Sequence, residues 1–143
     1  MVRAFYNWDS PSGIIVKQCQ SHALRLMLSS AVLAEYRKVL RYDRIATLRA
    51  LETQDAVEDV LDRLRYVSEF PFLTGVRFEY ARDSTDEKFI ELAIAGKATH
   101  LITRDKDLLS LGRDFSEVAK RFRHRAAFTR IIRPEQFLAE RNN

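Results

Sequence analysis

Residues 83–109 of this 143-residue chain read DSTDEKFIELAIAGKATHLITRDKDLL, and this stretch decides the fold class. Apolar residues recur at helical spacing from Phe89 to Ile94, and Ser84 and Glu87 ahead of them form the S-x-x-E pattern of a capping box. Gly96 is expected to end this helix, after which residues 100–103 predict a short strand and 107–111 a helical turn. A helix, a strand and a further helix in succession are typical of an α/β fold with a parallel sheet.

The same alternation continues on both sides of this stretch. Further helices are expected over 14–19, from an N-cap at Ser30 to 40, over 56–67 and from Pro134 onward, and strands over 24–28, within 70–80 and over 127–132. The pattern predicts a three-layer α/β fold, in which helices flank a central parallel sheet. The length favours a single domain over residues 1–143.

Composition narrows the function classes. The 24 Lys and Arg residues exceed the 20 Asp and Glu residues, which gives a net charge of +4 and favours polyanionic partners. Cys19 is the one cysteine, so no intrachain disulfide can form, and a reducing cytoplasm is the expected compartment. No apolar stretch reaches membrane-spanning length, so we expect no membrane partner. With four glycines and no glycine-rich phosphate loop, a nucleotide cofactor is not expected.

Three acids fall at or just after predicted strand ends, where ligands bind in open parallel sheets. These candidate metal ligands are Glu35, Asp86 and Asp105. Each also has an ordinary explanation: Glu35 could pair with Lys38, Asp86 could complement a helix dipole, and Asp105 could cap the turn that follows it. Together they would form an all-oxygen site suited to Mg²⁺ or Mn²⁺ and to phosphodiester chemistry, with Thr103 in a secondary role.

Four segments in order resemble one known family. They are 29–40 (SSAVLAEYRKVL), 83–93 (DSTDEKFIELA), 101–109 (LITRDKDLL) and 132–138 (IRPEQFL), and they resemble segments of PIN-domain proteins, particularly the VapC-like toxins of toxin–antitoxin systems. The resemblance implies a Mg²⁺- or Mn²⁺-dependent endoribonuclease. It also implies that Glu35, Asp86 and Asp105 are the catalytic, metal-binding acids, with Asp83 as an auxiliary ligand.

The start of the chain departs from the family pattern. Members begin with a buried strand that runs into "DTNVL", whose Asp is the first metal ligand, and that segment is not found here. Either residues 5–13 correspond to the region just downstream, or residues 2–7 are the strand with Asn7 at the Asp position. Neither alignment supplies the carboxylate, although Asp9 could reach inward. A missing central strand would expose sheet edges that a second copy of the chain could cover, which suggests a homodimer.

Two functional classes follow. The first is a PIN-type endoribonuclease, the toxin of a toxin–antitoxin pair, that cleaves single-stranded RNA. The second is a catalytically impaired PIN-like module that binds RNA, an antitoxin or its own copy. The candidates for steering RNA are Arg104, Lys106, Arg113, Lys120, Arg121, Arg123 and Arg125. Of these, the cations within residues 120–125 could instead form only a solvated helix face.

Overall fold

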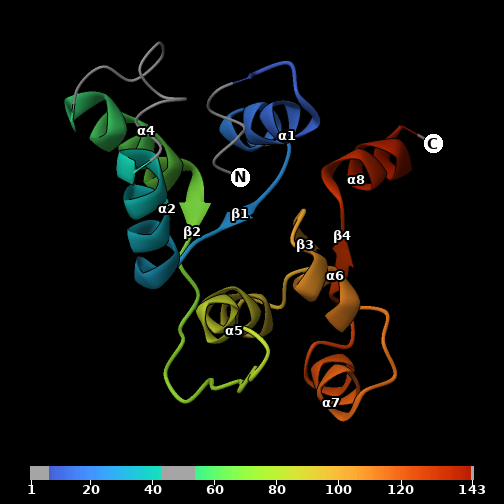
Figure 1. Cartoon of the computed structure of the whole chain (residues 1–143). Coiled ribbons are helices and arrows are strands. Elements are labelled where there is room, and N and C mark those ends of the chain that lie inside the picture. The colour runs from blue at the N-terminus through green and yellow to red at the C-terminus, as the bar shows by residue number, and fades with distance from the viewer. Residues whose placement is uncertain (1–6, 43–53, 143) are drawn as a thin grey trace. The chain divides into compact units, whose positions relative to one another are not determined.

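The computed structural model describes residues 7–42 and 54–142 (Figure 1). The chain divides into two compact units, residues 1–70 and 71–143. In the described part of each unit, helices alternate with short strands that pair in parallel, which confirms the predicted α/β class. The single domain over 1–143 stays a prediction.

The first unit holds two parallel strands among helices. Its elements are α1 (Pro11–Gln20), β1 (Leu26–Met27), α2 (Ser30–Tyr42), α4 (Gln54–Val67) and β2 (Ser68–Glu69). β1 pairs with β2 in the register Leu26 to Ser68 and Met27 to Glu69. The strand predicted over 24–28 is therefore present but shorter, because only two of its residues find a partner strand.

Helices α2 and α4 pack against each other through buried apolar side chains, among them Leu33, Leu40, Leu61 and Leu64. The Arg37 guanidinium donates to both carboxylate oxygens of Glu58, at 2.8 and 3.1 Å. This two-pronged ion pair therefore joins the polar sides of the two helices.

The cap of α2 differs from the prediction. The Oγ atom of Ser29 accepts a hydrogen bond from the Val32 N–H at 3.2 Å, and the Ser29 carbonyl accepts from the Leu33 N–H. Ser29 is also buried, whereas Ser30 is exposed. The N-cap is thus Ser29, and the predicted cap at Ser30 was wrong by one residue.

The second unit contains the stretch that opened the sequence analysis. Its elements are the 3₁₀ helix η2 (Ser84–Asp86), α5 (Glu87–Ala95), β3 (His100–Ile102), α6 (Lys106–Leu111), α7 (Glu117–Arg125), β4 (Arg130–Ile132) and α8 (Pro134–Arg141). β3 and β4 pair in parallel, with His100 opposite Arg130 and Ile102 opposite Ile132. The last strand was predicted from residue 127 but begins at Arg130.

The core of the second unit lies between α5, α6 and α7. Phe78, Ile90, Leu108 and Phe122 belong to one cluster of buried side chains, and the rings of Phe78 and Phe122 meet edge to face at 6.2 Å. Phe78 comes from the chain that precedes η2, so this core fixes the approach to the candidate acids.

The chain entering α1 shows where Asp9 lies. The predicted strand over residues 2–7 lies outside the described residues except for Asn7, whose side-chain oxygen accepts from the Asp9 N–H. The Asp9 side chain is 97% exposed and lies 3.6 Å from the Lys17 ammonium group. Asp9 therefore faces solvent, and the inward orientation considered for it was wrong. Gly13 is required here, because a Cβ atom would lie 2.5 Å from the Asn7 carbonyl oxygen.

Cys19, on α1, is buried, and this burial raises the pKa of its thiol to about 11. Its sulfur is therefore a packing group rather than a nucleophile. Among the helices that the structure describes, none has the length and apolar character needed to span a bilayer.

Candidate metal centre

Asp86 is a buried acid whose side chain is incompletely satisfied. It ends η2 and precedes α5, is 9% exposed, and makes no side-chain cap to α5. Its Oδ2 atom is buried without a hydrogen-bond partner among the described residues. Burial, followed by the negative charges of Asp105, Asp83 and Asp107, raises the pKa of Asp86 from 3.8 to about 6. A buried carboxylate among other acids is a favourable position for a cation.

Asp105 follows β3 and caps α6. Its Oδ1 atom accepts from the N–H groups of Asp107 at 2.8 Å and Leu108 at 3.0 Å. Its own N–H donates to Thr103 Oγ1 at 3.0 Å, and the Thr103 N–H donates to the Ile132 carbonyl. The capping role is thus confirmed. Because both capping bonds use Oδ1, Oδ2 is not committed to them.

Asp83 is the N-cap of η2. Its Oδ1 atom accepts from the N–H of Thr85 at 2.9 Å and from the Thr85 hydroxyl at 2.6 Å. These two hydrogen bonds hold the pKa of Asp83 below its usual value. Asp83 is therefore an ionised neighbour that adds to the negative potential at Asp86, and its role as an auxiliary ligand stays a prediction.

A fifth acid, Asp107, was not predicted from the sequence. Its carboxylate lies 3.3 Å from Arg82 Nε, and its backbone carbonyl accepts from the Tyr80 hydroxyl at 2.9 Å. Asp107 also contributes to the raised pKa of Asp86. The D-x-D spacing of Asp105 and Asp107 was the available signal.

Residues 77–80 approach the site as an extended segment without a partner strand. Phe78 and Tyr80 are buried while Arg77 and Glu79 are exposed, the alternation of a half-buried strand. The strand predicted within 70–80 thus has the expected alternation but pairs with no other strand among the described residues.

Charged side chains from two helices form hydrogen bonds with backbone N–H and carbonyl groups of residues 77–80. From α5, Glu91 accepts from the Phe78 N–H at 3.0 Å and Glu87 accepts from the Tyr80 N–H at 2.8 Å. From α7, Arg121 donates to the Glu79 carbonyl at 2.6 Å and Arg125 donates to the Arg77 carbonyl. We call residues 77–80 with these four side chains the loop clamp. Because Glu87 binds Tyr80, the predicted capping box with Ser84 was wrong.

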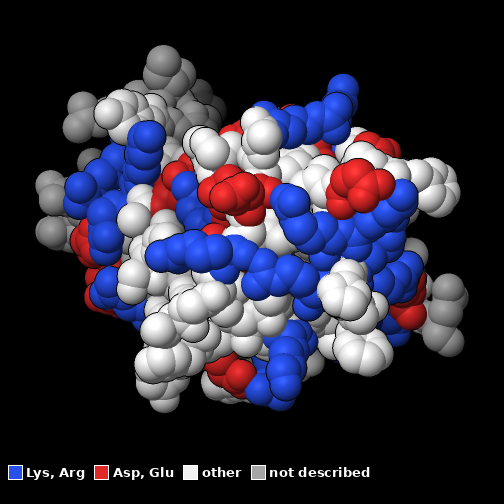
Figure 2. Space-filling model, turned by 90° about the horizontal axis from the view of Figure 1, so that it is seen from below, with Lys and Arg blue, Asp and Glu red and all other residues white. Residues whose placement is uncertain are grey.

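Most of the predicted RNA-steering cations have protein partners. Besides the two clamp arginines, Arg104 lies 2.5 Å from a Glu135 carboxylate oxygen, Lys120 binds Glu117 at 2.8 Å, and Arg123 donates to the Asp114 carbonyl. Lys106 and Arg113 are exposed. On the face in Figure 2, Lys and Arg side chains are interspersed with Asp and Glu. The steering role of these cations stays a prediction.

Glu35 lies on α2 in the first unit and is half-buried, and its role as a metal ligand stays a prediction. Within the described residues, no group of three or more His, Cys, Asp or Glu side chains is arranged to hold a metal ion. The structure thus supplies Asp86 as an incompletely satisfied acid, with Asp83, Asp105 and Asp107 as the neighbours that act on it.

Comparison with known families decides the class of protein. A family described as PIN domain matches residues 1–107, a range that includes Glu35, Asp86 and Asp105. The chain belongs to the PIN-domain family. PIN domains point in general to nuclease activity and to the use of divalent metals. No curated protein and no solved structure gives a significant match.

Although the described acids form no three-ligand group, Asp86 itself has properties that suit the divalent ion that PIN domains use. An unpaired buried carboxylate oxygen beside further acids offers hard oxygen donors and a negative potential, the properties that Mg²⁺ and Mn²⁺ require.

Proposed function

We propose that this PIN domain is a Mg²⁺- or Mn²⁺-dependent endoribonuclease that cleaves single-stranded RNA. The observation that carries the proposal is Asp86, whose buried Oδ2 lacks a partner and whose pKa is raised by neighbouring carboxylates. Such an arrangement is unfavourable unless a proton or a cation neutralises it. Membership in a nuclease family makes a divalent cation the fitting choice.

In the second unit, the ion would be held through Asp86 and Asp105, with Asp83 as an auxiliary ligand. When bound, a divalent ion neutralises these acids, polarises a phosphate oxygen and lowers the pKa of water. Asp105 is prepared for this role by its surroundings, because Thr103 fixes its backbone and the α6 N–H groups fix Oδ1. Little ordering is then required when the ion binds.

Asp86 contributes through its position at the start of α5. Its Oδ2 atom is buried, and the lower dielectric around it would strengthen its interaction with a cation. The exposed Lys106, next to Asp105, would attract the phosphate backbone of RNA.

We further propose that the protein is the toxin of a toxin–antitoxin pair and binds an antitoxin. The support is the resemblance of segments 29–40, 83–93, 101–109 and 132–138 to that branch of the family. Growth arrest on induction, which an Asp86→Asn, Asp105→Asn variant should not cause, tests this role. Arrest by both proteins, or by neither, would contradict it.

Manganese calorimetry combined with cleavage of a labelled single-stranded RNA tests the nuclease proposal. The wild-type chain is compared with Asp86→Asn, Asp105→Asn and with a matched control, Asp59→Asn, Asp62→Asn, which removes two exposed charges from α4. We expect the first pair to weaken Mn²⁺ binding by at least about 100-fold and to abolish cleavage, because two anionic ligands are lost. The control should bind and cleave as the wild type does.

Two results would contradict the proposal. Cleavage that survives in the Asp86→Asn, Asp105→Asn variant would place the chemistry elsewhere. A folded wild-type protein that binds RNA but neither binds Mn²⁺ nor cleaves would establish the impaired RNA-binding module instead.

A further inference from the structure

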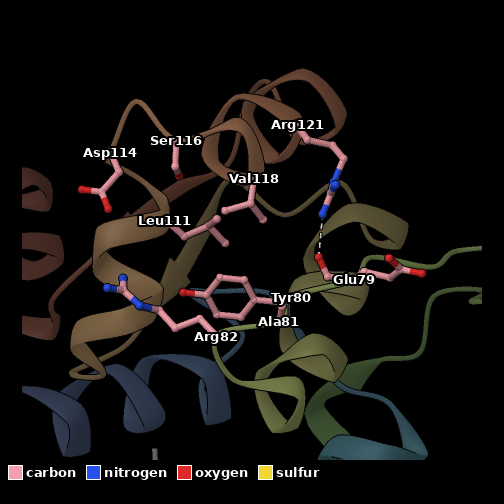
Figure 3. Close-up of a pocket in the computed structure, with 9 residues that line it drawn as sticks. All are labelled: Glu79, Tyr80, Ala81, Arg82, Leu111, Asp114, Ser116, Val118 and Arg121. Atoms are coloured by element: carbon pink, nitrogen blue, oxygen red, sulfur yellow. Dashed lines mark hydrogen bonds between the residues drawn. The ribbon is translucent and has the colours of Figure 1, made fainter.

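A pocket of about 460 Å³ opens in the second unit beside the loop clamp. Figure 3 shows the Tyr80 ring in the middle of the pocket, beneath Leu111 and Val118 in that view. Val118, which is half-buried, forms an apolar floor with the buried Tyr80 and Leu111 behind it. The polar residues that line the pocket are Glu79, Arg82, Asp114, Ser116 and Arg121.

The pocket adjoins the candidate acids through two of its own residues. The Tyr80 hydroxyl donates to the Asp107 carbonyl at 2.9 Å, and Arg82 Nε lies 3.3 Å from Asp107 Oδ1. Asp107 in turn lies near enough to Asp86 to act on its charge. A ligand in the pocket would therefore lie next to the candidate metal centre.

The pocket walls are held in place before any ligand arrives. Tyr80 is 2% exposed, and its backbone N–H is bound by Glu87. The Arg121 guanidinium binds the Glu79 carbonyl, drawn as a dashed line in Figure 3, and lies 5.0 Å from the centre of the Phe78 ring. Ser116 caps α7 by accepting from the Ala119 N–H. A site with fixed walls loses little entropy when it binds.

We propose that this pocket binds one nucleotide of the RNA strand, with the base on the apolar floor and the phosphate at Arg82. The volume is in the range of small-ligand sites. Bases bind apolar and aromatic surfaces through their faces, and guanidinium groups pair with phosphate oxygens. The Asp114 carboxylate and the Ser116 hydroxyl can accept from and donate to a base edge.

The charges at the pocket favour a single phosphate. Arg82 is the half-exposed cation at the acid side, whereas Asp114 brings negative charge to the same lining. The Asp114 carboxylate would repel a di- or triphosphate. The assignment to RNA rests on the proposed nuclease function, because the pocket chemistry by itself specifies a nucleotide.

Titration of the full chain with each of the four ribonucleoside 5′-monophosphates, in EDTA and followed by amide NMR, tests the inference. We expect saturable shifts of the amide signals of Arg82, Ser116 and Val118. Uridine, which lacks the phosphate, and ribose 5-phosphate, which lacks the base, should bind more weakly. Arg82→Gln should weaken nucleotide binding about tenfold, the loss typical of one charge-assisted hydrogen bond. Val118→Phe, which fills the floor, should also weaken it, whereas Lys97→Gln removes an exposed charge outside the lining and should not.

The inference is overturned if no pocket amide shifts, if ribose 5-phosphate binds as tightly as the nucleotides, or if Arg82→Gln and Val118→Phe both bind like the wild type. The amide spectrum of each variant reports its folding, and the two variants alter different walls. Asp86→Asn, Asp105→Asn should still bind nucleotides. Nucleotide binding by a chain that cleaves no RNA would thus refute the nuclease alone, and cleavage without pocket binding would refute the pocket alone.

Discussion

The Asp86 carboxylate is ionised at neutral pH, and this buried charge lowers the stability of the metal-free fold. Its pKa is raised from 3.8 to about 6, by burial first and then by neighbouring acids, so the folded state holds this proton more tightly than the unfolded chain does. The stabilising contribution of the protonated form is complete below about pH 4 and is lost as the pH rises through about 6. Above that pH the buried charge destabilises the fold.

Asp86→Asn should therefore raise the melting temperature in EDTA at pH 7.5. A shift of about two pKa units corresponds to up to about 3 kcal/mol, and each kcal/mol is worth roughly 2–4 °C in a chain of this size. The gain should shrink as the pH falls from about 6 to about 4. Thermal melts followed by circular dichroism across this range measure it. A variant less stable than the wild type at every pH would show that the Asp86 carboxylate makes a structural bond instead.

Single-residue features were predictable from sequence where they depend on near neighbours. The capping position of Asp105 follows from the residues directly around it, and the structure confirms the cap. The involvement of Asp107 was not predictable from its neighbours, because Tyr80 and Arg82 reach it from a segment more than one element away.

The loop clamp is an element in which side chains replace a partner strand. Glu87 and Glu91 accept from one edge of residues 77–80, while Arg121 and Arg125 donate to the other edge. A backbone N–H left unsatisfied in such a buried place costs about 1–3 kcal/mol. The order of this segment therefore depends on charged groups from two helices.

Glu91→Ala should destabilise the protein by about 1–3 kcal/mol, because the Phe78 N–H loses its acceptor while alanine suits the helix. Hydrogen exchange at the Phe78 amide should become faster in the variant. Asp59→Ala, on the exposed side of α4, is the matched control and should change little. Unchanged exchange at Phe78 would mean that Glu91 does not hold the segment.

Sequence patterns located this segment but did not describe it. The alternation of exposed and buried residues over 77–80 predicts which side chains face the core. It does not specify what satisfies the backbone, and here the acceptors and donors come from α5 and α7. The spacing of Ser84 and Glu87 likewise predicts a capping box, but it does not reveal that Glu87 accepts a hydrogen bond from the Tyr80 N–H instead.

At the scale of the whole molecule, the two units share one family match. The PIN-domain match runs over residues 1–107 and crosses the boundary between the units at residues 70 and 71. Each unit alone is about as small as domains that are only marginally stable, and its paired strands are two or three residues long. These features support the prediction of one domain.

We therefore expect one cooperative unfolding transition by differential scanning calorimetry, with the calorimetric enthalpy equal to the van't Hoff enthalpy. The measurement is best made in EDTA, so that no bound ion shifts the result. Two separate transitions, or a calorimetric enthalpy well above the van't Hoff value, would show instead that the two units unfold as separate domains.

The side chains that fluorescence and thiol-labelling experiments detect lie in the first unit. Trp8 and Cys19 are the one tryptophan and the one cysteine of the chain, and both belong to the first unit. Tryptophan fluorescence and thiol labelling of the natural chain therefore report only on the first unit. The second unit contains one tyrosine, Tyr80, and no tryptophan or cysteine. Phe115, 87% exposed in the second unit, is a position where an added tryptophan would make the other half visible to the same optical methods.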